Sequence, residues 1–361
     1  MPALFCGDDP RGFPRGRGGR GRGPVRGAMG AAGGRGRRGR APGGPRAGVR
    51  GRLGVGGPAG RRARGGGLQA GAGGRPVAEL NAGIASFYDQ SSGLWEDMWG
   101  EHMHHGYYPQ GKFRADHRQA QVDMVDRVLE WAGVDEAYPP SRTVDVGCGI
   151  GGSSRHIAQK YGSSGAGITL SPKQAERANA LSAAAGLGER LNFQVADALQ
   201  QPFQDGSFDL AWSLESGEHM PDKCRFFGEL ARVTAPGGRI IIVTWCHREL
   251  AAGEDTLPAK EQKLLDDICR AYYLPAWVPI SEYRRIAEEL GLEDIRVDDW
   301  SQEVSPFWAA VIQTALSRRG LVGLLRAGWS TLKGALVMPL MARGLKSGTI
   351  KFNLITAVKP K

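Results

Sequence analysis

The sequence lacks any apolar run approaching the roughly 20 residues that a membrane-spanning helix needs. Its five cysteines are scattered and include no CxxC pair. That spacing argues against a structural zinc site or a disulfide framework and favours a reducing compartment. No internal repeat occurs at solenoid spacing. The body is therefore expected to be soluble or peripheral to a membrane.

Residues 1–75 contain no lysine, serine or threonine, and their only acids are Asp8 and Asp9. They hold 17 arginines and 27 glycines and carry a net charge of +15. Residues 76–361 carry 30 basic and 35 acidic side chains, a net charge of −5, although the whole chain is at +10. A mildly acidic body argues against the basic groove of a nucleic-acid enzyme.

Two interpretations of this leader, residues 1–75, are open. Its few large apolar residues follow no period, so it cannot build a core and is predicted to be disordered or removed. Its Arg-Gly pairs resemble disordered RNA-binding tails, although it lacks interleaved tyrosine or phenylalanine. Its arginine-rich, acid-poor composition is typical of organelle-targeting peptides, although it lacks serine. We favour targeting and expect no nucleic-acid partner, since the body is acidic.

From Ser141 onward, short apolar runs alternate with amphipathic stretches, which is typical of an α/β fold with a mainly parallel sheet. Ser171 and Pro172 are typical of the N-cap and first position of a helix. This pattern predicts a seven-stranded, mostly parallel sheet with helices on both faces, its last strand lying at an edge. The expected strands are 143–146, 165–170, 192–195, 208–213, 239–245, 292–300 and 352–359, and the first helices are 153–161 and 172–184.

Two further helical segments follow. The insertion at about 247–291 is longer than ordinary loops. Insertions at the carboxyl ends of such strands lie over the ligand crevice, so we expect a lid or substrate wall. The segment Arg318–Lys346 is basic and apolar between its charges. It is interpreted either as a surface helix pair packed on the sheet or as a membrane-surface patch suited to a lipid-soluble substrate.

A glycine-rich turn follows the first expected strand and opens the first helix. Gly147, Gly149 and Gly151 permit a sharp turn and the close approach of a ligand, and the preceding Asp145 can capture a positive group. The spacing is GxGxG rather than the GxGxxG of dinucleotide sites. By itself, this segment would also fit an ordinary tight turn between strand and helix.

A dense aromatic and histidine segment precedes the sheet and includes WGEHMHHG at 99–106. Trp95 alone is best explained by core packing. His102, His104 and His105 have no acid or cysteine at a convincing ligand spacing, so no metal site is predicted.

These motifs resemble class I S-adenosylmethionine-dependent methyltransferases. The glycine turn resembles their motif I, the acid of 195–197 stands where the family contacts the adenine amino group, and 235–239 forms the turn before the fifth strand. The run 167–174, GITLSPKQ, replaces the acid that many members use for ribose. It resembles methyltransferases of sterols, tocopherols and fatty-acyl chains.

Three motifs narrow the resemblance to plant and algal γ-tocopherol methyltransferases: 99–106, the SLESGEHMPDK run at 213–223, and AYYLPAW at 271–277. The resemblance runs from about Ala78 to the C-terminus. It implies a Rossmann-like methyltransferase fold with an N-terminal helical cap and S-adenosylmethionine as cofactor, with Tyr88 and Trp99 over its methionine end. The implied cofactor-binding residues are Asp145, Gly147, Cys148, Gly149, Gly151, Thr169, Leu170, Gln174, Asp197, Ala198, Tyr88 and Trp99.

The implied activity is tocopherol C-methylation in vitamin E biosynthesis, converting γ- and δ-tocopherol to α- and β-tocopherol. A phenolic ring carbon becomes nucleophilic when the hydroxyl loses its proton, and histidine is the natural general base. His219 is the first candidate, because it follows the fourth strand at the crevice, and His102, His104 and His105 come next. Glu215 and Glu218 could act directly or orient a histidine.

Two other substrate classes stay open within the resemblance: an indole alkaloid methylated on nitrogen, and another lipophilic substrate methylated on carbon. In either case the partner is a small molecule, and a small lipophilic phenol is favoured. The leader corresponds to a plastid transit peptide, so a chloroplast location, associated with the envelope membrane, is expected. The sequence indicates no oligomeric state.

Overall fold

The structure is a computed structural model that describes residues 77–361 except 114–115, 135, 138 and 317–327, so the leader lies outside it. Its helices are α1 Val77–Trp99, η1 Pro109–Gly111, α2 His117–Ala132, α3 Gly152–Tyr161, α4 Pro172–Ala184, η2 Gly217–His219, α5 Lys223–Val233, α6 Ala259–Ala271, α7 Ile280–Glu289, α8 Ser301–Leu316 and α10 Gly328–Ser347. Its strands are β1 Arg142–Val146, β2 Ser164–Thr169, β3 Leu191–Val195, β4 Phe208–Leu214, β5 Thr234–His247, β6 Glu293–Asp299 and β7 Ile350–Val358.

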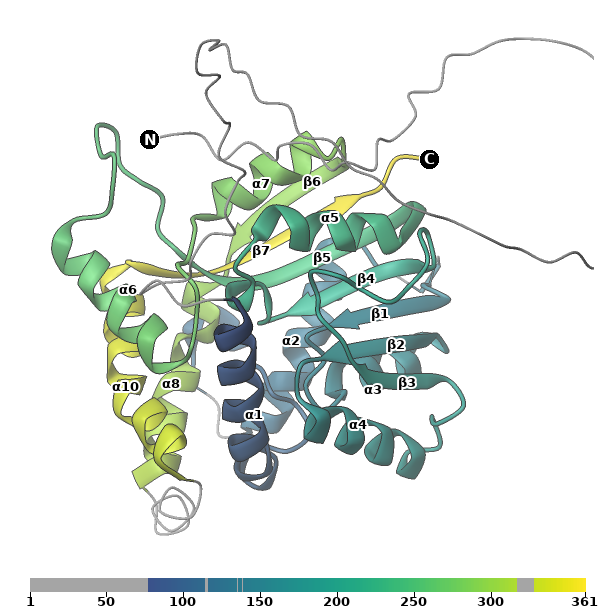
Figure 1. Ribbon diagram of the computed structural model, residues 1–361, viewed down its shortest axis with the longest axis horizontal. Helices are drawn as coiled ribbons and strands as arrows, with labels where there is room; N and C mark the ends of the chain where they lie inside the picture. The colour runs from purple at the N-terminus through teal and green to yellow at the C-terminus, as the bar shows by residue number, and fades with distance from the viewer. Residues whose placement is uncertain (1–76, 114–115, 135, 138, 317–327) are drawn as a thin grey trace, which may run out of the picture. The chain divides into compact units, whose positions relative to one another are not determined.

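The seven strands form one sheet in the order β3-β2-β1-β4-β5-β7-β6 (Figure 1). Strands β1 to β5 pair in parallel, whereas β7 pairs antiparallel with both β5 and β6. The chain moves outward in one direction from β1 and in the other from β4. Ligands of such sheets bind where the strand order reverses, at the carboxyl ends of the strands. The mostly parallel α/β sheet predicted from the sequence is confirmed.

The prediction that the last strand lies at an edge is wrong. β7 lies between β5 and β6, and β6 is the edge strand. β7 is buried along almost its whole length, because a strand pairs with it on each side. β6 carries Glu293, Asp298 and Asp299, all exposed. Charged side chains suit an edge because they oppose pairing with another strand.

Helices cover both faces of the sheet and build two main cores. On one face α5 and α7 pack together against the central strands, around Phe226, Phe227 and Ile286. On the other face α2 and α3 pack on each other, and α2 contributes Met124 and Leu129 to the second core. Each helix therefore turns an apolar stripe toward the sheet.

Four helices gather beyond the carboxyl ends of the parallel strands: α1, α6, α8 and α10 (Figure 1). α10 contacts α1, α6 and α8, and α1 also contacts α4. The insertion expected as a lid is divided, since α6 joins this group whereas α7 packs under the sheet on α5. Of the two helices of the insertion, only α6 therefore lies on the ligand side of the sheet.

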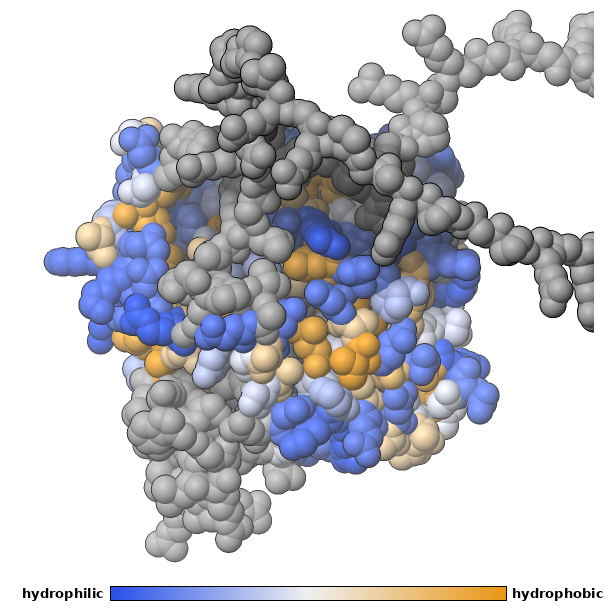
Figure 2. Space-filling view, viewed as in Figure 1, coloured by the Kyte–Doolittle hydropathy of each residue, from blue (hydrophilic) through white to orange (hydrophobic). Residues whose placement is uncertain are grey.

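The described end of α10 packs inward through Met338 and Met341, while Arg343 and Lys346 are exposed. Residues 317–327 of the basic segment lie outside the described part. In the described ranges, no helix combines the length and the apolarity needed to cross a bilayer. On the face shown in Figure 2, hydrophilic residues dominate the outer surfaces of α4 and α6, and hydrophobic residues form small patches between the helices.

Candidate active site

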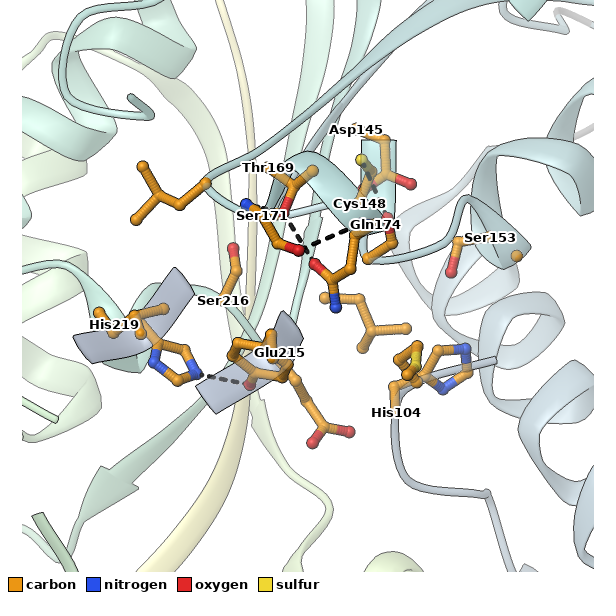
Figure 3. Close-up of a pocket in the computed structure, with 18 of the residues that line it drawn as sticks. His104, Asp145, Cys148, Ser153, Thr169, Ser171, Gln174, Glu215, Ser216 and His219 are labelled. Atoms are coloured by element: carbon orange, nitrogen blue, oxygen red, sulfur yellow. Dashed lines mark hydrogen bonds between the residues drawn. The ribbon is translucent and has the colours of Figure 1, made fainter. Parts of the chain in front are cut away.

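A cavity opens at the carboxyl ends of β1, β2 and β4 and encloses about 790 Å³ of atom-free space, part of it open to solvent (Figure 3). One wall is the glycine turn after β1, and a second is the segment 169–174 after β2. The third wall is the loop 214–220 after β4, with α1 and the histidine segment completing the enclosure. The three motifs that are separate in sequence therefore meet in one place.

The glycine turn has the conformation that the spacing predicts. Gly147, Gly149 and Gly151 all have positive φ, at 83°, 54° and 80°. A Cβ on Gly147 would overlap the side chain of Ser216, whose hydroxyl donates to the Val146 carbonyl at 2.7 Å. Glycine is therefore required at 147 both for conformation and for the contact between the β1 and β4 ends.

Asp145 is a buried carboxylate on the cavity wall. The Ser154 hydroxyl donates to it at 2.6 Å. Burial raises the pKa of Asp145 to about 7, and the Ser154 bond offsets this only in part. A buried carboxylate is stabilised in its charged form by a cationic partner. The wall is thus prepared for a positively charged ligand group.

The segment after β2 ties the cavity to α1. The Thr169 hydroxyl donates to Gln174 Oε1 at 2.8 Å, and Gln174 Nε2 donates to the hydroxyl of Ser92 at 3.1 Å. Ser171 caps α4 and also donates to Asp89 on α1. All of these residues except Asp89 are buried. This network fixes α1 over the cavity. The sequence of 167–174 does not by itself indicate that role.

Glu215 is the first residue after β4, and His105 holds it. The His105 amide and its ring Nδ1 each lie 2.6 Å from one Glu215 oxygen, and Trp245 Nε1 donates at 3.2 Å. Burial alone would raise the pKa of Glu215, but His105 holds that pKa below its ordinary value. Glu215 has φ of 54°, which is uncommon for a residue with a Cβ, and these bonds hold it there. Glu215 therefore places a fixed negative charge on the cavity wall.

The other two histidines of the segment form a neutral pair. His104 Nδ1 donates to the His105 carbonyl at 2.9 Å, so its Nε2 accepts from His102 Nδ1 at 3.1 Å. Burial lowers the pKa of His102 to about 2 and lowers that of His104. The amide of Gln121 donates to both carbonyls, His102 O and His104 O. His104 lines the cavity, whereas His102 packs behind it.

His219 ends the short helix η2 and lines the cavity opposite the glycine turn (Figure 3). Its Nε2 lies 3.1 Å from the hydroxyl of Tyr88 on α1. Its Nδ1 is buried without a hydrogen-bond partner. Burial lowers the pKa of His219 to about 4, so the ring is neutral at physiological pH. A neutral imidazole with one nitrogen uncommitted can accept a proton.

The structure brings most of the predicted site residues together. Tyr88, Asp145, Gly147, Cys148, Gly149, Thr169, Leu170, Gln174, Glu215 and His219 line the cavity. His105 and His102 stand behind that wall. Gly151 caps α3. Asp197 and Ala198 follow β3 at the same edge of the sheet, where Asp197 accepts from the Leu199 amide at 2.8 Å. Their roles stay predictions.

Trp99 does not reach the cavity wall. It is buried among core residues, with its ring 4.9 Å from that of Phe307 on α8. Tyr88 and Trp99 lie at opposite parts of α1, about 16 Å apart along a helix axis. One helix therefore cannot present both rings to the same end of a small cofactor.

Sequence reasoning missed several lining residues, most of them apolar: Ile84, Ala85, Met103, Leu214 and Met220. Nothing distinguishes them from core residues in the sequence. Met103 and His104 lie within the histidine segment, so its density was the available signal. Among the described residues, no group of three or more histidine, cysteine or acidic side chains is placed to hold a metal ion.

Gly152, the first residue of α3, is where the histidine segment packs on the glycine turn. A Cβ there would overlap the Glu101 carbonyl and lie 2.9 Å from His102 Nδ1. We expect Gly152→Ala to displace this segment and to lower the free energy of unfolding by about 1–3 kcal/mol, measured by denaturant titration. Gly228→Ala in α5 is the control, because its Cβ meets no atom within 4 Å. The free energy of unfolding of Gly228→Ala should rise by about 0.5–1 kcal/mol. Equal changes in the two variants would refute the packing argument.

The cavity fits S-adenosylmethionine. The buried Asp145 suits its cationic amino group, and the glycines leave the turn free of side chains where a ligand approaches. Thr169 and Gln174 supply hydroxyl and amide groups on the adjacent wall. Glu215 adds a negative charge to the cavity wall, which favours a cationic ligand such as a sulfonium.

Comparisons with known proteins agree with this geometry. Residues 144–242 match the family model described as a methyltransferase domain. The chain is similar to the probable tocopherol O-methyltransferase, chloroplastic, of Oryza sativa subsp. japonica, with 59% identity over 286 residues, 78% of this chain and 79% of the relative. It is 54% identical over 302 residues to the tocopherol O-methyltransferase, chloroplastic, of Arabidopsis thaliana, covering 82% and 87% of the two chains.

More distant similarity exists as well. Ajmaline N-methyltransferase of Rauvolfia serpentina is 38% identical over 291 residues, covering 78% of this chain and 99% of the relative. The fold is similar to a solved geranyl diphosphate methyltransferase, with a TM-score of 0.62 at 23% identity over 78% of this chain and 99% of that one. By these relatives and by its fold, the chain belongs to the tocopherol O-methyltransferase family of S-adenosylmethionine-dependent methyltransferases.

Proposed function

We propose that this protein methylates a ring carbon of the tocopherol chromanol, converting γ-tocopherol to α-tocopherol and δ-tocopherol to β-tocopherol in vitamin E biosynthesis. The observation that carries the proposal is the position of the neutral His219 in the same cavity as the glycine turn and Asp145. The names of the relatives from rice and Arabidopsis support tocopherol as the substrate class. The substrate is then a small lipophilic phenol.

Each wall residue has a defined task in this reaction. Asp145, the glycine turn, Thr169 and Gln174 hold the cofactor, which supplies an electrophilic methyl group when bound. His219 accepts the proton of the substrate hydroxyl through Nδ1, in the tautomer whose Nε2 donates to Tyr88. Removing that proton raises the electron density at the adjacent ring carbon, which is then a competent nucleophile. Tyr88 orients His219, and His105 orients Glu215.

The proton balance follows from the change in the ring. The ring carbon would form one carbon–carbon bond while the sulfur–methyl bond of the donor breaks and leaves a neutral thioether. The ring carbon would then lose its hydrogen as a proton when aromaticity returns. The hydroxyl is regained, so each turnover releases one proton, which His219 passes on. Burial of the site excludes water, a competing nucleophile. The enzyme mainly aligns the substrate, which by itself supplies a large part of a rate enhancement.

Carbon and oxygen are competing acceptors in this reaction, because a phenolate carries electron density on both. The names of the two plant relatives, by contrast, specify methylation on oxygen. Proton removal by His219 activates both atoms, and we propose carbon because a vitamin E product keeps its free hydroxyl.

Product analysis distinguishes these outcomes. We expect labelled methyl donor and γ-tocopherol in detergent to give a product that gains one methyl group and still ionises as a phenol in base. A product without an ionisable hydroxyl would show oxygen methylation. A sterol and an indole alkaloid are offered in parallel. Methylation of the alkaloid alone would overturn the tocopherol proposal in favour of nitrogen methylation, for which the similarity to ajmaline N-methyltransferase is the supporting observation.

The location is part of the same proposal. We infer that residues 1–75 address the protein to the plastid, supported by the word chloroplastic in both plant names. Arg343 and Lys346 are exposed at the described end of α10, and we propose that they contact the envelope membrane. A lipid-soluble substrate enters an enzyme most readily from a membrane surface.

A further inference from the structure

Lys223 occupies a position that helix stability does not explain. It is the first residue of α5, where the helix dipole disfavours a cation. Its side chain is buried, with 8% of its surface exposed. Burying an ammonium costs free energy unless all its protons are donated. A lysine at this position is therefore expected to stabilise a neighbouring part of the structure rather than the helix itself.

The Lys223 ammonium donates to the turn that carries His219. It lies 2.8 Å from the Gly217 carbonyl oxygen, 2.7 Å from that of Met220 and 3.4 Å from that of Glu218. These carbonyls stand on both sides of His219 in the chain. One cation thus crosslinks η2 and fixes the backbone from which the His219 ring extends toward Tyr88.

The charge of Lys223 is not neutralised by Glu218, its strongest electrostatic neighbour. The titratable groups facing it are Glu218, Cys246, Cys269 and Asp222, and those facing His219 are Lys223, Glu215 and Tyr88. Burial, followed by repulsion from Glu215, raises the pKa of Glu218 to about 8, so its carboxyl is mostly neutral at pH 7. Burial lowers the pKa of Lys223 to about 8, which leaves it mostly charged at that pH. The positive charge therefore acts on His219.

We propose that Lys223 is a positioning residue that fixes the His219 turn and keeps the His219 ring in the unprotonated state able to accept a proton. It touches neither the cavity nor the reacting atoms, and it acts through His219. The part of the proposal that concerns catalysis rests on the proposed function, in which His219 is the general base. The part that concerns the charge state of His219 does not.

The experiment compares Lys223→Met, Lys223→Arg and a matched control. Lys359 provides the control, because its ammonium also donates to three carbonyls, those of Ala231, Arg232 and Thr234. It lies at the opposite end of α5 from the cavity. Lys359→Met therefore removes the same kind of crosslink without approaching His219.

The first readout is the NMR titration of the His219 ring in protein labelled at its seven histidines, assigned by comparison with His219→Asn. Loss of a neighbouring positive charge favours the protonated ring. We expect the midpoint of His219 to rise by about one pH unit in Lys223→Met, and to stay near the wild-type value in Lys223→Arg and Lys359→Met. An unchanged midpoint in folded Lys223→Met would overturn the proposal.

The second readout is turnover as a function of pH. In Lys223→Met, the acidic limb of the pH profile of kcat should shift to higher pH by the same amount as the His219 midpoint. Cofactor affinity should stay unchanged. If the midpoint rises but the kcat limb does not move, the assignment of His219 as general base fails while the effect of Lys223 on His219 stands. Absence of γ-tocopherol methylation by the wild-type protein would instead overturn the proposed function. If Lys223→Met does not fold, Lys223→Arg decides, since a raised midpoint in that charge-preserving variant contradicts the proposal.

Discussion

His219→Asn should lower kcat by about 10²- to 10⁴-fold while leaving cofactor affinity nearly unchanged, the range expected for removing a general base. Asparagine keeps a polar group that can bond the Tyr88 hydroxyl, but it cannot take up a proton at neutral pH. The measurement is single-turnover methylation of γ-tocopherol with labelled methyl donor, combined with calorimetry of cofactor binding.

The matched control for this substitution is His156→Asn. His156 bonds Asp126 at 2.9 Å between α2 and α3 and does not line the cavity. Its loss should leave turnover as in the wild type. Unchanged turnover in both His219→Asn and Glu215→Gln, with the cofactor still bound, would rule out proton removal by this loop.

Asp145→Asn should weaken binding of S-adenosylmethionine by about 10²-fold or more, because breaking a buried charge pair typically costs about 2–5 kcal/mol. Asparagine is nearly isosteric and keeps an oxygen for the Ser154 hydroxyl, so the fold should survive. Calorimetric titration of both proteins at pH 8 gives the ratio of dissociation constants. Equal affinities would show that Asp145 does not hold the cationic group.

The pH dependence of binding has a defined sign. Burial raises the pKa of Asp145 to about 7 in the free protein, so the carboxyl is partly protonated below that pH. A cation binds only the deprotonated form. Wild-type affinity should therefore rise between pH 6 and pH 8, with proton release near pH 7, and then level off.

In Asp145→Asn this rise should be absent. Asp209→Asn is the control, since Asp209 accepts from Ser141 and Arg142 at the opposite end of the sheet. That variant should lose stability but keep the wild-type affinity and its pH dependence.

Much of the fold could be predicted because strand and helix patterns are local. The strands β1 to β5 follow short apolar runs, and Ser171 and Pro172 mark the start of α4 as expected. The position of β7 was mispredicted, because pairing order is a long-range property. Only the comparison of the buried β7 with the charged β6 shows which of them belongs at the edge.

The candidate site shows the same difference between local features, which the sequence predicts, and long-range contacts, which it does not. The glycine turn and the acid before it are recognisable because positive φ and close approach demand particular residues at fixed spacing. The pairing of His105 with Glu215, 110 positions apart, is not recognisable in that way. Neither is the burial of Trp99 against Phe307, which depends on how α1 and α8 pack together.

By itself, the sequence determined the α/β fold class, the cofactor turn and the set of histidines and acids from which the chemistry must be drawn. These depend on backbone conformation and side-chain chemistry, which are local. Only the tertiary structure decided which of those groups is a neutral acceptor and which a fixed charge. The pKa of each depends on burial and on neighbours supplied by other elements, as Glu215 and Lys223 do for His219.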